Sequence, residues 1–106
     1  MGVVKINIYS EMTDFDTIGK SLPGSKGGSM FGLRTYNMGR KPFMMLYEGE
    51  LVCRLFGQDK AAALTLPGTR LFNPRNNRME NWVQIPREQG ANWLEWAAKA
   101  QATVPG

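Results

Sequence analysis

Two short apolar runs on either side of Glu48-Gly49 constrain the fold of this chain more than any other feature of its sequence. Apolar residues recur with a period of two within residues 41–47 and again within residues 51–56. This alternation is typical of β-strands, and a glycine between two such runs supplies the positive φ of a tight hairpin. Because both faces of the predicted hairpin are largely apolar, we expect both faces to be covered.

Strand and helix patterns also precede this hairpin. Residues 3–9 alternate β-branched and polar side chains, which predicts an additional strand at the start of the chain. A short helix is predicted next, ended by Pro23-Gly24, from apolar residues that share one helical face: Phe15, Ile18 and Leu22. We expect a loop over residues 24–28 and a strand over residues 29–36.

The second half of the chain predicts two more helices and a last strand. An alanine-rich helix spans residues 60–66, and a strand begins at Trp82 and ends before Pro86. The final helix has one apolar stripe, made of Trp93, Trp96, Ala97, Ala100 and Val104. Together the elements predict a single α+β domain over residues 1–106, with an antiparallel sheet of four to six strands and N-terminal, middle and C-terminal helices packed on it.

The composition excludes several kinds of site. The 106 residues include no histidine and one cysteine, Cys53, which excludes histidine-paired nucleophiles, an intrachain disulfide and a cysteine zinc cluster. We therefore expect no catalytic residue, no metal site and no cofactor. The net charge of +4 permits weak attraction to anionic partners without requiring it. With no long apolar segment and no secretion signal, we expect a cytoplasmic protein without a membrane partner.

The densest polar and basic stretch lies between residues 70 and 78. It contains the candidate anion- or nucleic-acid-binding residues of this chain: Arg70, Arg75, Asn76, Asn77 and Arg78. Asn73 lies within the same stretch. Arginine guanidinium groups suit phosphates, and asparagine amides can contact base edges. The alternative is a solvated loop whose arginines pair with Glu80 or Glu88.

Other chemically notable residues are assigned to packing. Trp82, Trp93 and Trp96 are expected in the core rather than stacked on bases, and Cys53 is expected to be a buried, inert thiol. The methionines are assigned to packing or a dimer surface, and Glu48 and Glu50 to solvated positions in a turn. Gly19-Lys20-Ser21 is interpreted as a helix end rather than a phosphate-binding loop.

Several short motifs occur in a consistent order and spacing. They are Met30-Phe31-Gly32, the central hairpin, Phe72-Asn73-Pro74 and the run Met79-Glu80-Asn81-Trp82-Val83-Gln84-Ile85-Pro86. With them, residues 29–102 resemble the N-terminal domain of TfoX/Sxy-type proteins, a family associated with the regulation of bacterial competence. The resemblance implies an α+β fold and brings no catalytic residues. Residues 1–28 are atypical of the family, and we expect a single-domain member without its C-terminal domain.

Three functions follow as expectations. The first is a small non-enzymatic binding or regulatory module that acts through protein–protein contacts, in transcriptional or competence-type regulation, as a homodimer whose extra strand at residues 3–9 offers a pairing edge. The second is a nucleic-acid-binding domain that uses the loop at residues 70–78. The third is a small-molecule binder or enzyme with an apolar pocket near the methionines.

Overall fold

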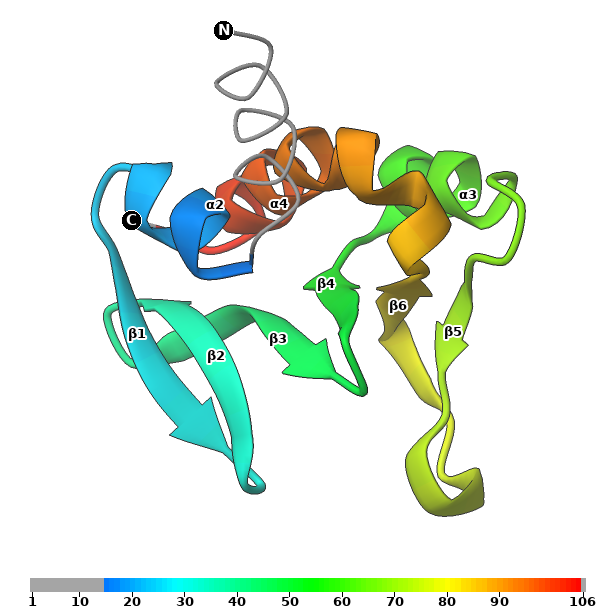
Figure 1. Ribbon diagram of the computed structural model, residues 1–106, viewed down its shortest axis with the longest axis horizontal. Coiled ribbons are helices and arrows are strands. Elements are labelled where there is room, and N and C mark those ends of the chain that lie inside the picture. The colour runs from blue at the N-terminus through cyan, green and yellow to red at the C-terminus, as the bar shows by residue number, and fades with distance from the viewer. Residues whose placement is uncertain (1–14, 106) are drawn as a thin grey trace, which may run out of the picture.

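The two alternating runs around Glu48-Gly49 form the centre of an antiparallel sheet in the computed structural model, which describes residues 15–105 (Figure 1). They are β3 (Lys41–Tyr47) and β4 (Glu50–Arg54), paired antiparallel. Glu48 and Gly49 have φ values of 50° and 76°, the left-handed backbone that a two-residue hairpin turn requires. The predicted hairpin is confirmed.

Within the described residues the sheet has six strands in the order β1-β2-β3-β4-β6-β5, and every neighbouring pair is antiparallel. The remaining strands are β1 (Ser25–Met30), β2 (Leu33–Met38), β5 (Arg70–Phe72) and β6 (Met79–Ile85). Because β6 lies between β4 and β5, the shorter strand β5 forms one edge of the sheet and β1 the other. An antiparallel sheet with helices packed on it confirms the predicted α+β class.

The first hairpin corrects two sequence predictions. The loop expected at residues 24–28 is strand β1, and the single strand expected at residues 29–36 turns back on itself at Phe31-Gly32. Gly27 and Gly28 have weak strand propensity and no side chains that alternate, so the strand gives no periodic signal. The strand predicted at residues 3–9 lies outside the described residues.

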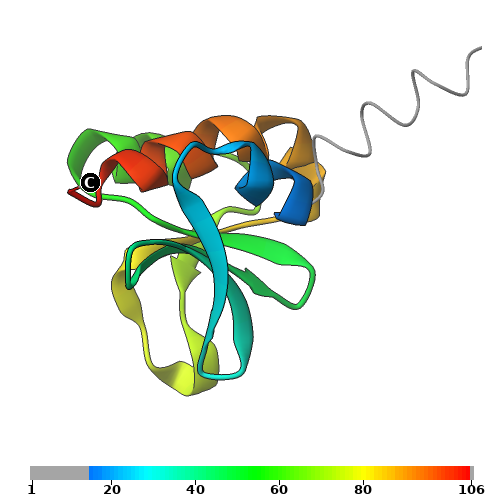
Figure 2. The ribbon, with the colours of Figure 1, turned by 90° about the vertical axis from the view of Figure 1, so that its left-hand side faces the viewer.

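Three helices lie on one face of the sheet, as Figures 1 and 2 show: α2 (Phe15–Ser21), α3 (Gly57–Leu64) and α4 (Trp93–Ala102). The three predicted helices are thereby confirmed, and Gly19-Lys20-Ser21 ends α2 as expected. Two 3-10 turns complete the elements: η1 (Pro74–Asn76) between β5 and β6, and η2 (Arg87–Asn92) before α4. None of the helices within residues 15–105 is long and apolar enough to cross a membrane.

The main core lies between these helices and the sheet. The predicted apolar stripe of α4 is buried throughout, and the indole nitrogen Nε1 of Trp93 donates to the carbonyl oxygen of Pro86 at 3.1 Å. Helix α2 approaches β2 closely at Gly19, where an added Cβ would lie 2.5 Å from the ring of the buried Tyr36. This core covers one face of the sheet, and no helix of residues 15–105 lies on the other, which we call the helix-free face.

Candidate functional site

The helix-free face of the sheet carries a second, smaller apolar cluster. Only Met45, Val52 and Phe72 are buried in it, and the ring of Tyr47 meets that of Phe72 edge-on, with centroids 5.0 Å apart. Partly buried side chains surround these three: Met30, Leu33, Tyr47, Met79 and Trp82. The central hairpin is thus apolar on both faces, as predicted, but only one of its faces lies under helices.

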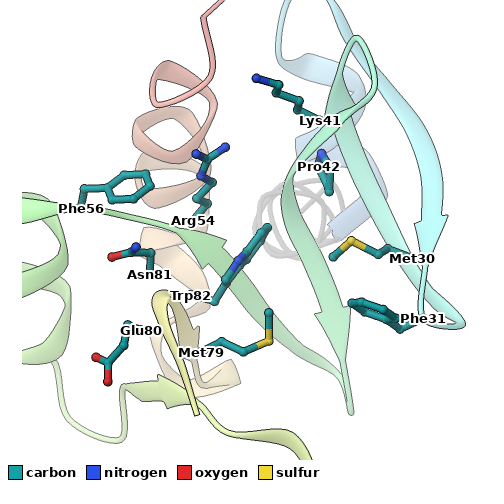
Figure 3. Close-up of a pocket in the computed structure, with 10 residues that line it drawn as sticks. All are labelled: Met30, Phe31, Lys41, Pro42, Arg54, Phe56, Met79, Glu80, Asn81 and Trp82. Atoms are coloured by element: carbon teal, nitrogen blue, oxygen red, sulfur yellow. The ribbon is translucent and has the colours of Figure 1, made fainter. Parts of the chain in front are cut away.

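A groove of about 620 Å³ opens beside this cluster (Figure 3). Its residues come from the β1–β2 turn, the beginning of β3, the end of β4 and the beginning of β6. They are Met30, Phe31, Lys41, Pro42, Arg54, Phe56, Met79, Glu80, Asn81 and Trp82. In Figure 3, Trp82 lies between Phe56 on one side and Phe31 on the other. Half of the residues that line the groove are therefore aromatic or methionine.

Two aromatic rings of the groove are exposed to solvent. Phe31 is 84% exposed and Phe56 is 39% exposed, and they are the exposed large hydrophobic residues of the described chain. Phe31 occupies the first position of the β1–β2 turn with φ at 56°, followed by Gly32 at 77°. A bulky residue in the left-handed region is unusual, because this backbone favours Gly, Asn and Asp. Backbone strain and exposure therefore coincide at Phe31.

The groove also contains charged side chains. The Arg54 guanidinium lies over the ring of Phe56, 5.0 Å from its centroid. The Glu80 carboxylate accepts from Nε of Arg78 at 3.1 Å, and the Glu80 carbonyl oxygen accepts from Nζ of Lys60 at 2.9 Å. Lys41 is exposed at the beginning of β3 and makes no ion pair with a described residue. Cations therefore outnumber the single carboxylate at this site.

The structure separates the arginines of the predicted anion-binding loop. Arg70 lies opposite Gln84 in the sheet and donates to Oε1 of Glu50 at 2.9 Å and to the carbonyl oxygen of Gly68 at 2.7 Å. The other four predicted residues, Arg75, Asn76, Asn77 and Arg78, lie at or beside η1, in the β5–β6 turn. Of these, Arg78 pairs with Glu80, one of the two acids expected for the solvated alternative.

The two glutamates of the central turn have different environments. Glu48 is exposed, as expected, whereas Oε1 of Glu50 accepts from Arg70 and, at 2.8 Å, from Nε2 of the buried Gln84. The prediction that both carboxylates are merely solvated is therefore wrong for Glu50. Arg70 on β5 and Gln84 on β6 donate hydrogen bonds to the Glu50 carboxylate. Pairing between residues this far apart in the chain leaves no local pattern in the sequence.

The remaining candidates divide between core and groove. Trp93 and Trp96 are buried as predicted, whereas Trp82 is only half-buried and lines the groove. Cys53 is fully buried, and burial raises the pKa of its thiol far above the ordinary range because the thiolate would be desolvated. Within residues 15–105, no cluster of His, Cys, Asp and Glu could hold a metal ion.

Comparison with known proteins identifies no relative. The chain matches no protein-family model, no curated protein and no solved structure. The resemblance to TfoX/Sxy N-terminal domains therefore stays a prediction from the motifs, and the geometry of the groove carries the functional argument.

Proposed function

We propose that this chain is a non-enzymatic binding module that holds a protein partner in the groove on the helix-free face of its sheet. One observation carries the proposal: both exposed large hydrophobic residues of the described chain, Phe31 and Phe56, line this one groove. Exposed apolar side chains are ordinary when scattered singly, but together around a groove they mark an interaction site.

The chemistry of the groove favours contact over catalysis. Phe31, Phe56 and Trp82 supply large rigid areas of the kind that dominates binding at protein interfaces. Met30 and Met79 supply flexible side chains that adapt to the shape of a partner. Charged and polar side chains lie beside these apolar ones, and such a mixture is ordinary at protein–protein interfaces.

The biological process and assembly remain those implied by the sequence. We propose transcriptional or competence-type regulation, which rests on the resemblance to TfoX/Sxy N-terminal domains. We also propose a homodimer in the bacterial cytoplasm. These proposals concern the biological process, the assembly and the compartment. The groove supports only the proposal that the module binds a protein partner.

A small apolar molecule is the second candidate ligand. The sequence analysis proposed an apolar pocket near the methionines, and this candidate is supported by Met30 and Met79 in the lining of the groove. Its volume falls in the range of roughly 300–1,000 Å³ that small-molecule sites occupy. A thermal-shift screen with apolar metabolites tests this candidate, because a ligand of the native state raises the melting temperature.

Selection from a displayed library of random peptides tests the main proposal. We expect selected peptides to lose about tenfold in affinity on Phe31→Ala or Phe56→Ala, because truncating an anchor residue removes roughly 1–2 kcal/mol. The matched control is Leu94→Ala, which removes a half-buried hydrophobic side chain on the helical side. If the library yields no ligand, or ligands equally sensitive to Leu94→Ala, the groove is not a protein-binding site.

A further inference from the structure

We infer that the partner presents an acidic segment, in which carboxylates flank the apolar side chains that enter the groove. This inference rests on the proposed function and adds the chemistry of the partner. Three features of the groove carry it: the sign of the charge around it, the lack of an acidic partner among the described residues for both of its lining cations, and the position of Arg54 over an aromatic ring.

The net charge of the chain is concentrated at this site. The charged lining residues are Lys41, Arg54 and Glu80, and the cations that contact Glu80 are Lys60 and Arg78. These four cations and one acid carry a net charge of +3, compared with +4 for the whole sequence. The rest of the sequence is therefore nearly balanced, and the charge around the groove has the sign that attracts an anionic partner.

The two cations of the groove lining, Lys41 and Arg54, have no acidic partner among residues 15–105, and Lys60 donates to the Glu80 carbonyl oxygen rather than to a carboxylate. Arg78 is paired with the Glu80 carboxylate, but no described carboxylate lies within ion-pair distance of Lys41 or Arg54. Arg54 is nevertheless held in place by the ring of Phe56. A guanidinium fixed at the edge of an apolar groove is preorganised to accept a carboxylate in a two-pronged hydrogen bond.

The same features favour a protein over a single-stranded nucleic acid. Nucleic acids bind to positively charged grooves by stacking bases on exposed aromatic rings. Here the Arg54 guanidinium already covers one face of the Phe56 ring, and Glu80 places a carboxylate in the lining, where it would repel phosphates. Arg70, predicted for nucleic-acid contact, is bound to Glu50 instead. Separate carboxylates can approach Lys41 and Arg54 while avoiding Glu80.

Fluorescence anisotropy with two labelled peptides tests the inference. Both peptides carry the same phenylalanine- and leucine-rich centre, flanked by glutamates in one and by lysines in the other. We expect the glutamate-flanked peptide to bind at least tenfold more tightly at low salt. The difference should largely disappear near 1 M salt, where the screening length is about 3 Å.

Paired substitutions locate the charge effect. We expect Lys41→Gln with Arg54→Gln to weaken binding of the glutamate-flanked peptide by about tenfold, and to leave the lysine-flanked peptide unweakened. The matched control, Lys20→Gln with Arg87→Gln, removes the same charge from α2 and η2. An equal loss in the control would overturn the inference, because attraction would then come from net charge alone.

The outcomes distinguish this inference from the proposed function. If both peptides bind equally and Phe31→Ala weakens both, the groove binds proteins but the partner is not acidic. If neither peptide binds, and the random library also yields no ligand, the proposed function itself fails. Tighter binding of a labelled oligothymidylate than of the acidic peptide, lost on Lys41→Gln with Arg54→Gln, would assign the groove to nucleic acid instead.

Discussion

Phe31 combines two properties that rarely occur in one residue. Its backbone has a positive φ in a two-residue turn, a position where asparagine followed by glycine is preferred. Its aromatic ring is 84% exposed at the edge of the groove, so burial within the chain does not compensate the strain. A side chain that stabilises neither its turn nor the core is consistent with a role in binding.

Replacing Phe31 should therefore separate stability from binding. We expect Phe31→Asn to raise the free energy of unfolding by about 1 kcal/mol, because asparagine tolerates the left-handed backbone. The thermal midpoint should rise by roughly 4–8 °C, measured by circular dichroism. Binding of groove ligands should weaken in the same variant.

The matched control is Glu48→Asn, in the equivalent position of the β3–β4 turn and outside the groove. It should stabilise the protein similarly and leave binding unchanged. A Phe31→Asn protein that is less stable than wild type would contradict the assignment of strain to this residue.

Cys53 gives the fold a defined response to alkaline pH. In the unfolded chain its thiol ionises above pH of about 8.5, whereas burial raises the pKa of the folded thiol and keeps it protonated. The folded state therefore holds a proton that the unfolded state releases. This contribution to stability is complete below the unfolded pKa and decreases as the pH rises above it.

The expected loss at pH 10 is about 2 kcal/mol relative to neutral pH, from this thiol alone. Urea denaturation of the wild type and of Cys53→Ala at neutral pH and at pH 10 measures it. The variant should be less stable at neutral pH, because it leaves a small cavity, but should lose less on going to pH 10. Equal losses in both proteins would show that Cys53 contributes nothing to the alkaline transition.

Among the elements, the strands β4, β6 and β5 are connected by a polar network on the helix-free face. Oε1 of Glu50 accepts from Arg70 on β5 and from the buried Gln84 on β6. Glu50 thus joins three strands, and it satisfies a buried amide that no solvent molecule would readily reach.

Removing this carboxylate should destabilise the sheet locally. We expect Glu50→Ala to lower the free energy of unfolding by about 1–2 kcal/mol, because the Gln84 amide loses its acceptor while still buried. Glu48→Ala, across the turn, should change it by less than about 0.5 kcal/mol. Urea denaturation midpoints compare the two, and equal midpoints would mean that the network contributes nothing to stability.

The sequence predicts an element well where its signal is local and periodic. The central hairpin and the stripe of α4 follow from apolar spacing alone, and both are present as expected. The sequence does not predict strand β1, because Gly27-Gly28 has no such spacing. It does not predict the β1–β2 turn either, because phenylalanine, which stands at position 31, is rarely found in turns. Pairing with β2 forms this strand in spite of its composition.

At the scale of the whole molecule, the sequence suggests an apolar pocket near the methionines but not the set of residues that line it, because no single segment contains them. Met30, Pro42, Arg54 and Trp82 are far apart in the chain and come together only through the order and curvature of the strands. The methionines and Trp82 are visible in the sequence, but methionine favours packing or a dimer surface, and the apolar strand around Trp82 favours the core. The three described helices all lie on the same face of the sheet, which leaves the smaller apolar cluster on the other face without helical cover.

Assembly is also a property of the whole molecule, and β1 offers an edge for it. An antiparallel pairing centred between Gly27 and Gly28 would place Lys26 opposite Ser29 of a second copy, so the cations would not oppose one another. We expect the sedimentation coefficient to rise with concentration through the micromolar range. A monomer at every concentration would contradict the homodimer.

The position of β6 between β4 and β5 has a consequence for synthesis on the ribosome. Strand β4, with its buried Leu51, Val52 and Cys53, gains its second sheet neighbour only when residues 79–85 have been made. Helix α4, which covers β3 and β4, is translated later still. Until then an apolar strand edge is unpaired in the nascent chain, and this is the interval in which chaperones would protect it from aggregation.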